Sequence, residues 1–165
     1  MASSGTATLV LPTDEQILIT RAFDAPRHLV YRAWTTPELI RRWWHAKRGE
    51  VMVVEVDLRV GGKWRYVMVA DDGMEVGFHG EYLEIVPEER IVSTETYEGL
   101  PEGVSEEDGT TVNTATFEEQ DGRTTVTLLI QAPNTISRDA IIDSGMELGL
   151  QDALDLLEEV ARSLA

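Results

Sequence analysis

Short glycine turns divide the middle of the chain into segments in which apolar residues recur at every second position. Gly61-Gly62, Asp72-Gly73 and Asp121-Gly122 supply the residues that best tolerate the positive φ angles of tight hairpin turns. An apolar residue at every second position is typical of a strand that buries one face. The pattern therefore predicts an antiparallel meander from Val51 to Gln131, and it constrains the fold more than any other feature of the chain.

The first of these turns lies inside DLRVGGKWRYVMV, which predicts a hairpin from Asp57 to Val69. Trp64, Tyr66 and Met68 share one face of its second strand, and Phe78 adds another ring from the following strand. Such a face is bulky and soft. It fits either ordinary sheet core or the wall of a ligand cavity.

Helical spacing surrounds the predicted meander. A strand over Ile17 to Phe23 precedes a helix from Arg27 to about Trp34, and Thr36-Pro37-Glu38 begins a second short helix with favoured residues at its start. The chain ends in a predicted long helix from around Arg138 to Ser163, whose apolar residues are three or four positions apart. This order predicts an α+β fold in which a curved antiparallel sheet of about six to seven strands wraps around the C-terminal helix, with two short helices after the first strand.

Length and composition predict one domain. The chain has 165 residues, 42% of them hydrophobic, and no cysteine, so disulfides and thiolate metal sites are excluded. We expect residues 1–14 to be a flexible segment or to extend the first strand, and residues 15–165 to form the domain. The sequence contains no basic leader and no apolar run of membrane-spanning length, which predicts a cytoplasmic protein without a membrane span.

Charge is strongly negative and unevenly distributed. Fourteen Lys and Arg against thirty Asp and Glu give a net charge of −16, which argues against nucleic-acid binding. Residues 98–165 hold 3 basic and 15 acidic side chains. This half presents either a solvated acidic surface or a binding face for a basic partner. Within it, residues 98–109 are rich in Gly, Pro and acid and predict a mobile loop.

Two glycines in the predicted C-terminal helix require an explanation. Gly145, Gly149 and Ala153 are four residues apart, and each glycine inside a helix costs about 0.5 to 1 kcal/mol relative to alanine. Either the helix packs closely on the sheet there, or the glycines leave space for a ligand. The aromatic face of the hairpin favours the second interpretation.

The segment RRWWHAKRG, from Arg41 to Gly49, combines four positive charges with two tryptophans. Its tryptophans could plug the core while the arginines stay exposed. Alternatively, the segment lies at the mouth of a cavity, where it recognises an anionic group on an apolar ligand or rests on a membrane surface.

Signals for catalysis are weak. His28, His45 and His79 do not have metal-ligand spacing, and the sequence has no nucleophile or cofactor-binding motif. His79 and Glu81 share one face of a predicted strand, as an acid-base pair or as two exposed side chains. We therefore expect no catalytic residue, metal or cofactor, and a binding module rather than an enzyme.

Four stretches resemble a known family: RAFDAPRHLVYRAWTTPELIRRWW (21–44), DLRVGGKWRY (57–66), GEYLEIVPEERIVST (80–94) and GMELGLQDALDLLEEVA (145–161). They are similar to the activator-of-heat-shock-ninety-ATPase-like branch of the START-like, or SRPBCC, superfamily, over about residues 15–163. The resemblance implies a helix-grip fold with a deep cavity that often holds lipids, polyketides or other apolar molecules. It also implies a place in the stress response. The N-terminal domain of the eukaryotic co-chaperones has no counterpart here, so the resemblance is to a stand-alone C-terminal-type domain.

The leading hypothesis is non-enzymatic binding or carriage of a small hydrophobic, lipid- or polyketide-like molecule between sheet and C-terminal helix. The alternatives are a chaperone-type adaptor that binds a protein partner through its acidic half, and a cyclase- or hydrolase-type enzyme that uses His79 or a cavity tyrosine. The candidate cavity residues are Trp34, Trp43, Trp44, His45, Trp64, Tyr66, Met68, Phe78, Tyr82, Met146, Gly149, Leu150 and Ala153.

Overall fold

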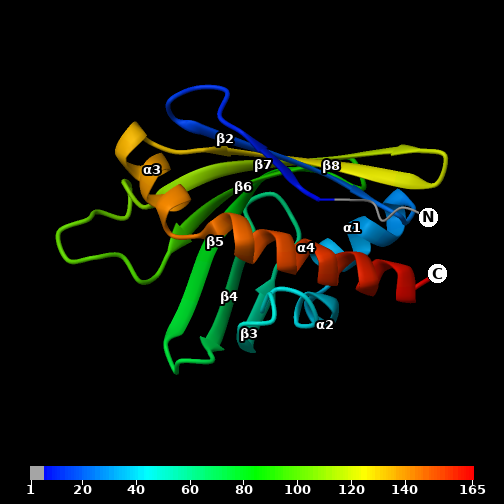
Figure 1. Ribbon diagram of the computed structural model, residues 1–165, viewed down its shortest axis with the longest axis horizontal. Coiled ribbons are helices and arrows are strands. Elements are labelled where there is room, and N and C mark those ends of the chain that lie inside the picture. The colour runs from blue at the N-terminus through cyan, green and yellow to red at the C-terminus, as the bar shows by residue number, and fades with distance from the viewer. Residues whose placement is uncertain (1–5) are drawn as a thin grey trace.

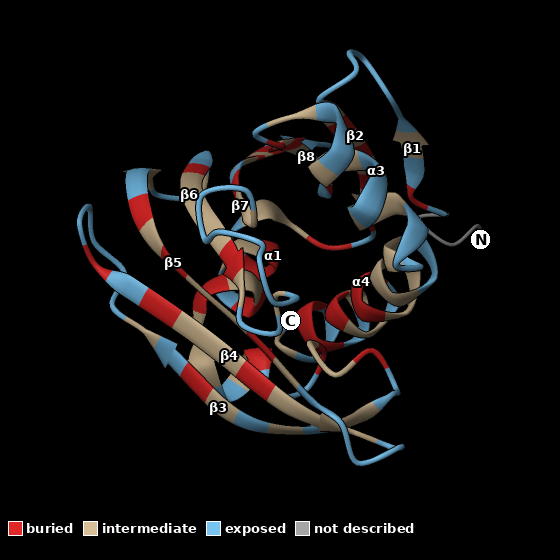
Figure 2. Ribbon diagram, turned by 90° about the vertical axis from the view of Figure 1, so that its left-hand side faces the viewer, coloured by how far each residue is buried: buried red, intermediate tan, exposed pale blue. Residues whose placement is uncertain are grey.

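The computed structural model describes residues 6–165, and within them the chain forms one eight-stranded antiparallel sheet in the order β1-β2-β8-β7-β6-β5-β4-β3. The strands are β1 (Thr8–Val10), β2 (Gln16–Phe23), β3 (Gly49–Val56), β4 (Lys63–Ala70), β5 (Glu75–Val86), β6 (Arg90–Tyr97), β7 (Thr110–Gln120) and β8 (Arg123–Gln131). The helices are α1 (Arg27–Thr35), α2 (Pro37–Ile40), α3 (Thr135–Asp143) and α4 (Met146–Ser163). The sheet curves around α4, which confirms the predicted helix-grip architecture (Figures 1 and 2).

Two of the three predicted glycine turns form tight hairpins. Asp121 and Gly122 have φ angles of 55° and 79°, and the pairing of β7 with β8 continues without a shift up to Gln120 and Arg123. Gly73, with a φ of 88°, closes the hairpin between β4 and β5. Both turns therefore use residues that adopt positive φ at low cost, as predicted.

The predicted strand that begins at Asp57 was wrong. β3 ends at Val56 and β4 begins at Lys63, so residues 57–62 form a longer connection. The Gly61 N–H donates to the Tyr82 carbonyl at 2.8 Å, and the Tyr82 N–H donates to the Gly62 carbonyl at 3.0 Å. The two glycines thus form backbone hydrogen bonds with β5 and do not close a two-residue turn.

The single long helix predicted from Arg138 to Ser163 was also wrong in its first third. Asn134 caps α3 by accepting a hydrogen bond from the Ser137 N–H at 2.8 Å, so this helix begins earlier than predicted. The chain then breaks at Gly145, whose φ of 83° is left-handed, and α4 begins at the next residue. Of the two glycines, therefore, only Gly149 lies inside a helix and incurs the helical cost.

An ion-paired arginine and apolar packing hold α4 on the sheet. Leu157 and Ala161, on the inward face of α4, are fully buried. Arg21 of β2 is only 2% exposed, and its guanidinium lies 3.1 Å from an Asp155 oxygen and 3.0 Å from a Glu158 oxygen. These contacts fix the C-terminal half of the helix and leave its N-terminal half to border the cavity described below.

The sheet has more strands than the six to seven expected because residues 8–10 pair with β2. The rest of the segment predicted to be flexible includes residues 1–5, which lie outside the described residues. The domain boundary at residue 15 and the mobility of residues 98–109, which connect β6 to β7, stay predictions. Within residues 6–165, no helix is both long enough and apolar enough to cross a membrane.

Candidate functional site: a cavity between sheet and helix

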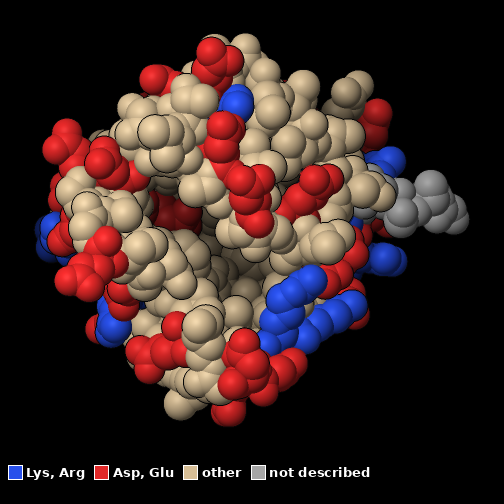
Figure 3. Space-filling view, turned by 60° about the vertical axis from the view of Figure 1, so that its left-hand side comes forward, with Lys and Arg blue, Asp and Glu red and all other residues tan. Residues whose placement is uncertain are grey.

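A cavity of about 490 Å³ lies between the inner face of the sheet and the N-terminal half of α4. Figure 3 shows its opening as a hollow whose wall is mostly uncharged, surrounded by acidic side chains and a smaller group of basic ones. The volume falls within the roughly 300 to 1,000 Å³ that is usual for small-molecule sites. Such a space is suited to an apolar ligand.

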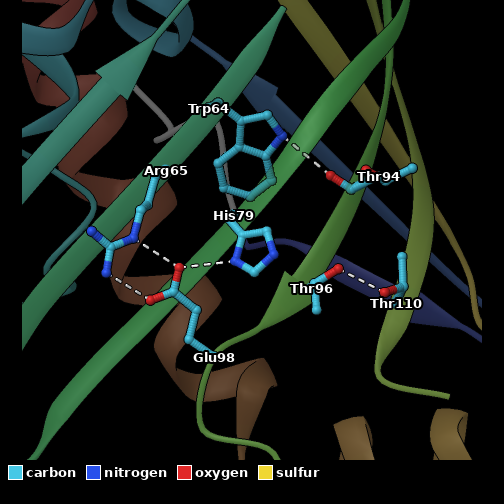
Figure 4. Close-up of polar contacts among 7 residues, drawn as sticks. All are labelled: Trp64, Arg65, His79, Thr94, Thr96, Glu98 and Thr110. Atoms are coloured by element: carbon cyan, nitrogen blue, oxygen red, sulfur yellow. Dashed lines mark hydrogen bonds and ion pairs between the residues drawn. The ribbon is translucent and has the colours of Figure 1, made fainter. Parts of the chain in front are cut away.

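Aromatic side chains from the sheet form one wall. Trp64 and Tyr66 of β4 have ring centroids 4.8 Å apart, and Trp44 packs edge-on against Tyr66 at 5.5 Å and against Phe78 at 6.0 Å. The Trp64 indole N–H donates to the Thr94 carbonyl at 3.1 Å, so this ring is fixed in place (Figure 4). Strand alternation and mutual packing therefore produce a rigid aromatic surface.

Helix α4 forms the facing wall. Met146, Gly149, Leu150 and Ala153 line the cavity from consecutive turns. A Cβ atom at Gly149 would meet no heavy atom within 4 Å. Gly149 thus borders open space and is not a point of close packing between helix and sheet.

All of the candidate cavity residues except His45 line the cavity. The His45 imidazole instead accepts a hydrogen bond from the Lys47 N–H at 3.0 Å within its own turn. Trp43 also has a structural role, because it is 7% exposed and its indole N–H donates to the Ala33 carbonyl at 2.8 Å.

The basic segment approaches the cavity through one cation. Of its four positive residues, Arg48 lines the space, and its guanidinium lies 2.7 Å from a carboxylate oxygen of Asp152. Ala46 and Lys47 just before it have φ angles of 52° and 61°, a left-handed conformation that non-glycine residues rarely adopt. Contacts around Arg48 hold this segment in place.

A polar group inside the cavity was missed from the sequence. Ser93 and Glu95 of β6 and Asn113 of β7 line the same space. The only available signal was alternation, which places Ser93 and Glu95 on the face of buried Ile91. The cavity is therefore mainly apolar, and these three residues form a polar region within its wall.

Burial controls the ionisation of this region. It raises the pKa of Tyr66 well above its usual range, with further contributions from Tyr82 and Glu95. Burial likewise raises the pKa of Tyr82 to about 12. The pKa of Glu95 is raised by burial, and the Asn113 side chain opposes that rise. Both tyrosines are protonated at neutral pH and can donate hydrogen bonds, but they are not bases.

His79 lies on the opposite face of the sheet, away from the cavity. Its Nδ1 is 2.9 Å from an oxygen of Glu98, which Arg65 also holds through two contacts of 2.8 and 2.9 Å (Figure 4). Glu81 pairs with Lys63 at 3.1 Å instead. The acid-base pair considered for His79 and Glu81 is therefore not formed. Among the described residues, no cluster of His, Asp or Glu has an arrangement that could hold a metal ion.

Comparisons with known proteins agree with this architecture. A sequence profile described as "Activator of Hsp90 ATPase homolog 1-like protein" matches residues 24–162. A Rhodobacter sphaeroides protein of known structure is 20% identical with a TM-score of 0.86, covering 96% of this chain and 99% of its own. For a Chromobacterium violaceum protein the identity is 28%, the TM-score 0.76 and the coverages 90% and 98%. A Staphylococcus epidermidis protein of known structure is 27% identical with a TM-score of 0.77, and the match covers 94% of each chain.

A search of curated protein sequences found no significant match. The profile match extends from the end of β2 almost to the end of α4 and so includes the cavity walls. The chain therefore belongs to the Activator of Hsp90 ATPase homolog 1-like protein family.

Proposed function

We propose that this protein binds or carries a small apolar molecule, of lipid or polyketide type, in the cavity between the sheet and α4. The observation that carries the proposal is the cavity itself, about 490 Å³ with a wall of mainly aromatic and aliphatic side chains. Protein interiors are normally close-packed, with few voids larger than a water molecule. A space of this size is therefore better explained as a binding site than as a packing defect.

The composition of the wall supports binding without chemistry. The tyrosines that face the cavity hold their protons at neutral pH, and His79 lies on the outer face of the sheet. The polar groups of the cavity can orient a ligand through hydrogen bonds, as the few polar groups of apolar sites commonly do. Family membership is in keeping with binding or carriage.

A protein partner is the second candidate, favoured by the acidic surface around the opening in Figure 3. A basic partner, such as a chaperone in the stress response, would be attracted to this surface, and high salt would weaken the complex. Loss of the complex on substitution of cavity residues alone would instead assign the partner to the cavity.

The main proposal is tested by filling the cavity. Gly149→Leu adds a side chain where a Cβ has no neighbour within 4 Å, so its first atom enters open space. Binding of the neutral fluorescent probe N-phenylnaphthylamine should weaken by at least about tenfold, because the leucine occupies the probe's volume. Glu159→Leu adds a leucine to the exposed side of the same helix and serves as the matched control.

Circular dichroism and urea denaturation establish that both variants are folded. A folded Gly149→Leu variant that binds the probe as tightly as the parent protein would overturn the proposal. Equal weakening in Glu159→Leu would do so as well, since that residue does not face the cavity.

A further inference from the structure

The carboxyl group of Glu95 faces the cavity without a cationic partner. Glu95 lies on β6 between the aromatic wall and β7, and it lines the space together with Ser93, Asn113 and Tyr66. Among residues 6–165, none of the ion pairs of the structure involves Glu95. Arg48, the one cation among the described residues of the cavity wall, is paired with Asp152.

Neighbouring polar side chains orient this carboxyl group. The Thr111 hydroxyl donates to the Oδ1 of Asn113 at 2.8 Å, which leaves the amide NH₂ of Asn113 to interact with Glu95. Thr111 is 5% exposed and is also the direct cross-strand neighbour of Glu95. The network satisfies part of the carboxyl group and leaves the rest of its acceptor capacity toward the cavity.

An ionised carboxylate in an apolar space is costly unless a cation or hydrogen-bond donor compensates it. A hydroxyl on the ligand would supply a hydrogen bond, but a protonated amine would supply a hydrogen bond and the missing positive charge. The surrounding rings favour the cation further, because aromatic faces attract ammonium groups. Trp44, Tyr66 and Phe78 line the same cavity, and Trp44 contacts each of the other two rings.

The charge of the whole molecule acts in the same direction. A net charge of −16 and acidic side chains around the opening raise the local concentration of cations and lower that of anions. The sequence had suggested that the segment from Arg41 to Gly49 could recognise an anionic group. Its one charged residue on the wall is an arginine already bound to Asp152, so the cavity offers an anion no free positive charge within the described residues.

We propose that Glu95 is the recognition group of the cavity and that the molecule it selects carries a protonated amine on an apolar body. This inference rests on the proposed function, since it requires that the cavity admit a ligand. It adds the class of that ligand and the residue that distinguishes it from neutral or anionic molecules of the same shape.

The test compares three molecules that share a phenylbutyl body: phenylbutylamine, phenylbutanol and phenylbutyrate. At neutral pH they are cationic, neutral and anionic respectively. Their affinities are measured by calorimetry and by displacement of N-phenylnaphthylamine. We expect the amine to bind about tenfold more tightly than the alcohol, and the acid to bind most weakly.

Glu95→Gln should remove the preference of the amine over the alcohol. The matched control Glu118→Gln removes the same charge from an exposed position on β7 and should keep the preference. Equal affinities of amine and alcohol for the parent protein, or a preference that survives Glu95→Gln, would overturn the inference. Failure of the neutral probe to bind would instead count against the proposed function, and the calorimetric comparison would still decide the role of Glu95.

Discussion

Arg48 and Asp152 form an ion pair beside the cavity, with 2.7 Å between the guanidinium nitrogen and the carboxylate oxygen. The pair joins the segment between α2 and β3 to α4. The same guanidinium nitrogen donates to the Ala46 carbonyl at 2.7 Å, and the Arg48 carbonyl accepts from the Asp71 N–H at 2.8 Å. These contacts hold a backbone whose left-handed residues cost on the order of 1 to 3 kcal/mol each.

Loss of this ion pair should affect ligand exchange more than stability. Both side chains are partly exposed, at 43% and 38%, so Asp152→Asn should change the free energy of unfolding by less than about 1 kcal/mol. The probe should nevertheless dissociate several times faster, because the segment beside the cavity loses its link to α4. Stopped-flow fluorescence measures this rate. As a control, Asp57→Asn breaks the exposed pair with Arg59 and should leave the dissociation rate of the probe unchanged. An unchanged dissociation rate in Asp152→Asn would refute the role of the pair between Arg48 and Asp152.

The two glycines near the start of α4 should respond to alanine with opposite signs. Gly145 has a φ of 83°, and a Cβ there meets no neighbour, so Gly145→Ala should destabilise the protein by about 1 to 2 kcal/mol through backbone strain alone. Gly149→Ala should stabilise it by about 0.5 to 1 kcal/mol, because alanine is the better helix former. Urea denaturation of both variants measures the difference. Shifts of the same sign would show that the break between α3 and α4 is not as described.

Glu98 on the outer face should contribute stability that depends on pH. Hydrogen bonds from Arg65 and His79 lower the pKa of Glu98 from 4.5 to about 2, the arginine being the larger cause. The resulting contribution to stability is fully present above pH 4.5 and is lost as the pH falls toward about 2. Because Arg65 and His79 are 43% and 42% exposed, solvent screening reduces its value, and Glu98→Gln should cost about 1 kcal/mol at neutral pH.

Urea denaturation of the parent protein and Glu98→Gln at several pH values checks this effect. The difference between the two should shrink as the solution is acidified. Glu81→Gln removes a carboxylate with one contact to exposed Lys63 and should cost less. A constant difference across the pH range would show that the Glu98 carboxylate is not held by these partners.

The contribution of Glu95 to stability should have the opposite pH dependence to that of Glu98. Burial raises the pKa of Glu95 above 4.5 in the folded protein, so its protonated form is favoured on folding. The resulting contribution to stability is present below 4.5 and is lost as the pH rises through the folded-state pKa. Glu95→Gln should therefore be more stable than the parent protein at neutral pH, and this gain should disappear in acid. Thermal denaturation across that range tests the sign, and a loss of stability at neutral pH would contradict it.

The fold could be predicted from the sequence where the determinants were local. Asp121-Gly122 forms the predicted turn because its two residues accept positive φ whatever surrounds them. Gly61-Gly62 does not close a two-residue turn, since its backbone bonds to Tyr82, twenty residues along the chain. The break at Gly145 was hidden because apolar Ile142, Met146 and Leu150 keep helical spacing across it.

The residues of the site likewise fall into those that local sequence patterns predict and those that they do not. Trp64, Tyr66 and Met68 could be placed on one wall because strand alternation assigns their face without knowledge of the partner strands. Glu95 was missed because an acidic residue in a strand usually faces solvent, and its orientation became apparent only when β6 was seen to pair with β5 and β7. His45 was misplaced for a related reason, since no periodic pattern determines the conformation of a turn.

The central claim, that an apolar molecule binds between the sheet and α4, can be tested with the methionines of the chain. Met68 and Met146 line the cavity, whereas Met52 and Met74 are 51% and 63% exposed. In methyl NMR spectra of protein labelled at methionine, N-phenylnaphthylamine should shift the Met68 and Met146 signals and show nuclear Overhauser contacts to them, while Met52 and Met74 stay unchanged. Shifts confined to Met52 and Met74 would place the probe on the outer surface and contradict the claim.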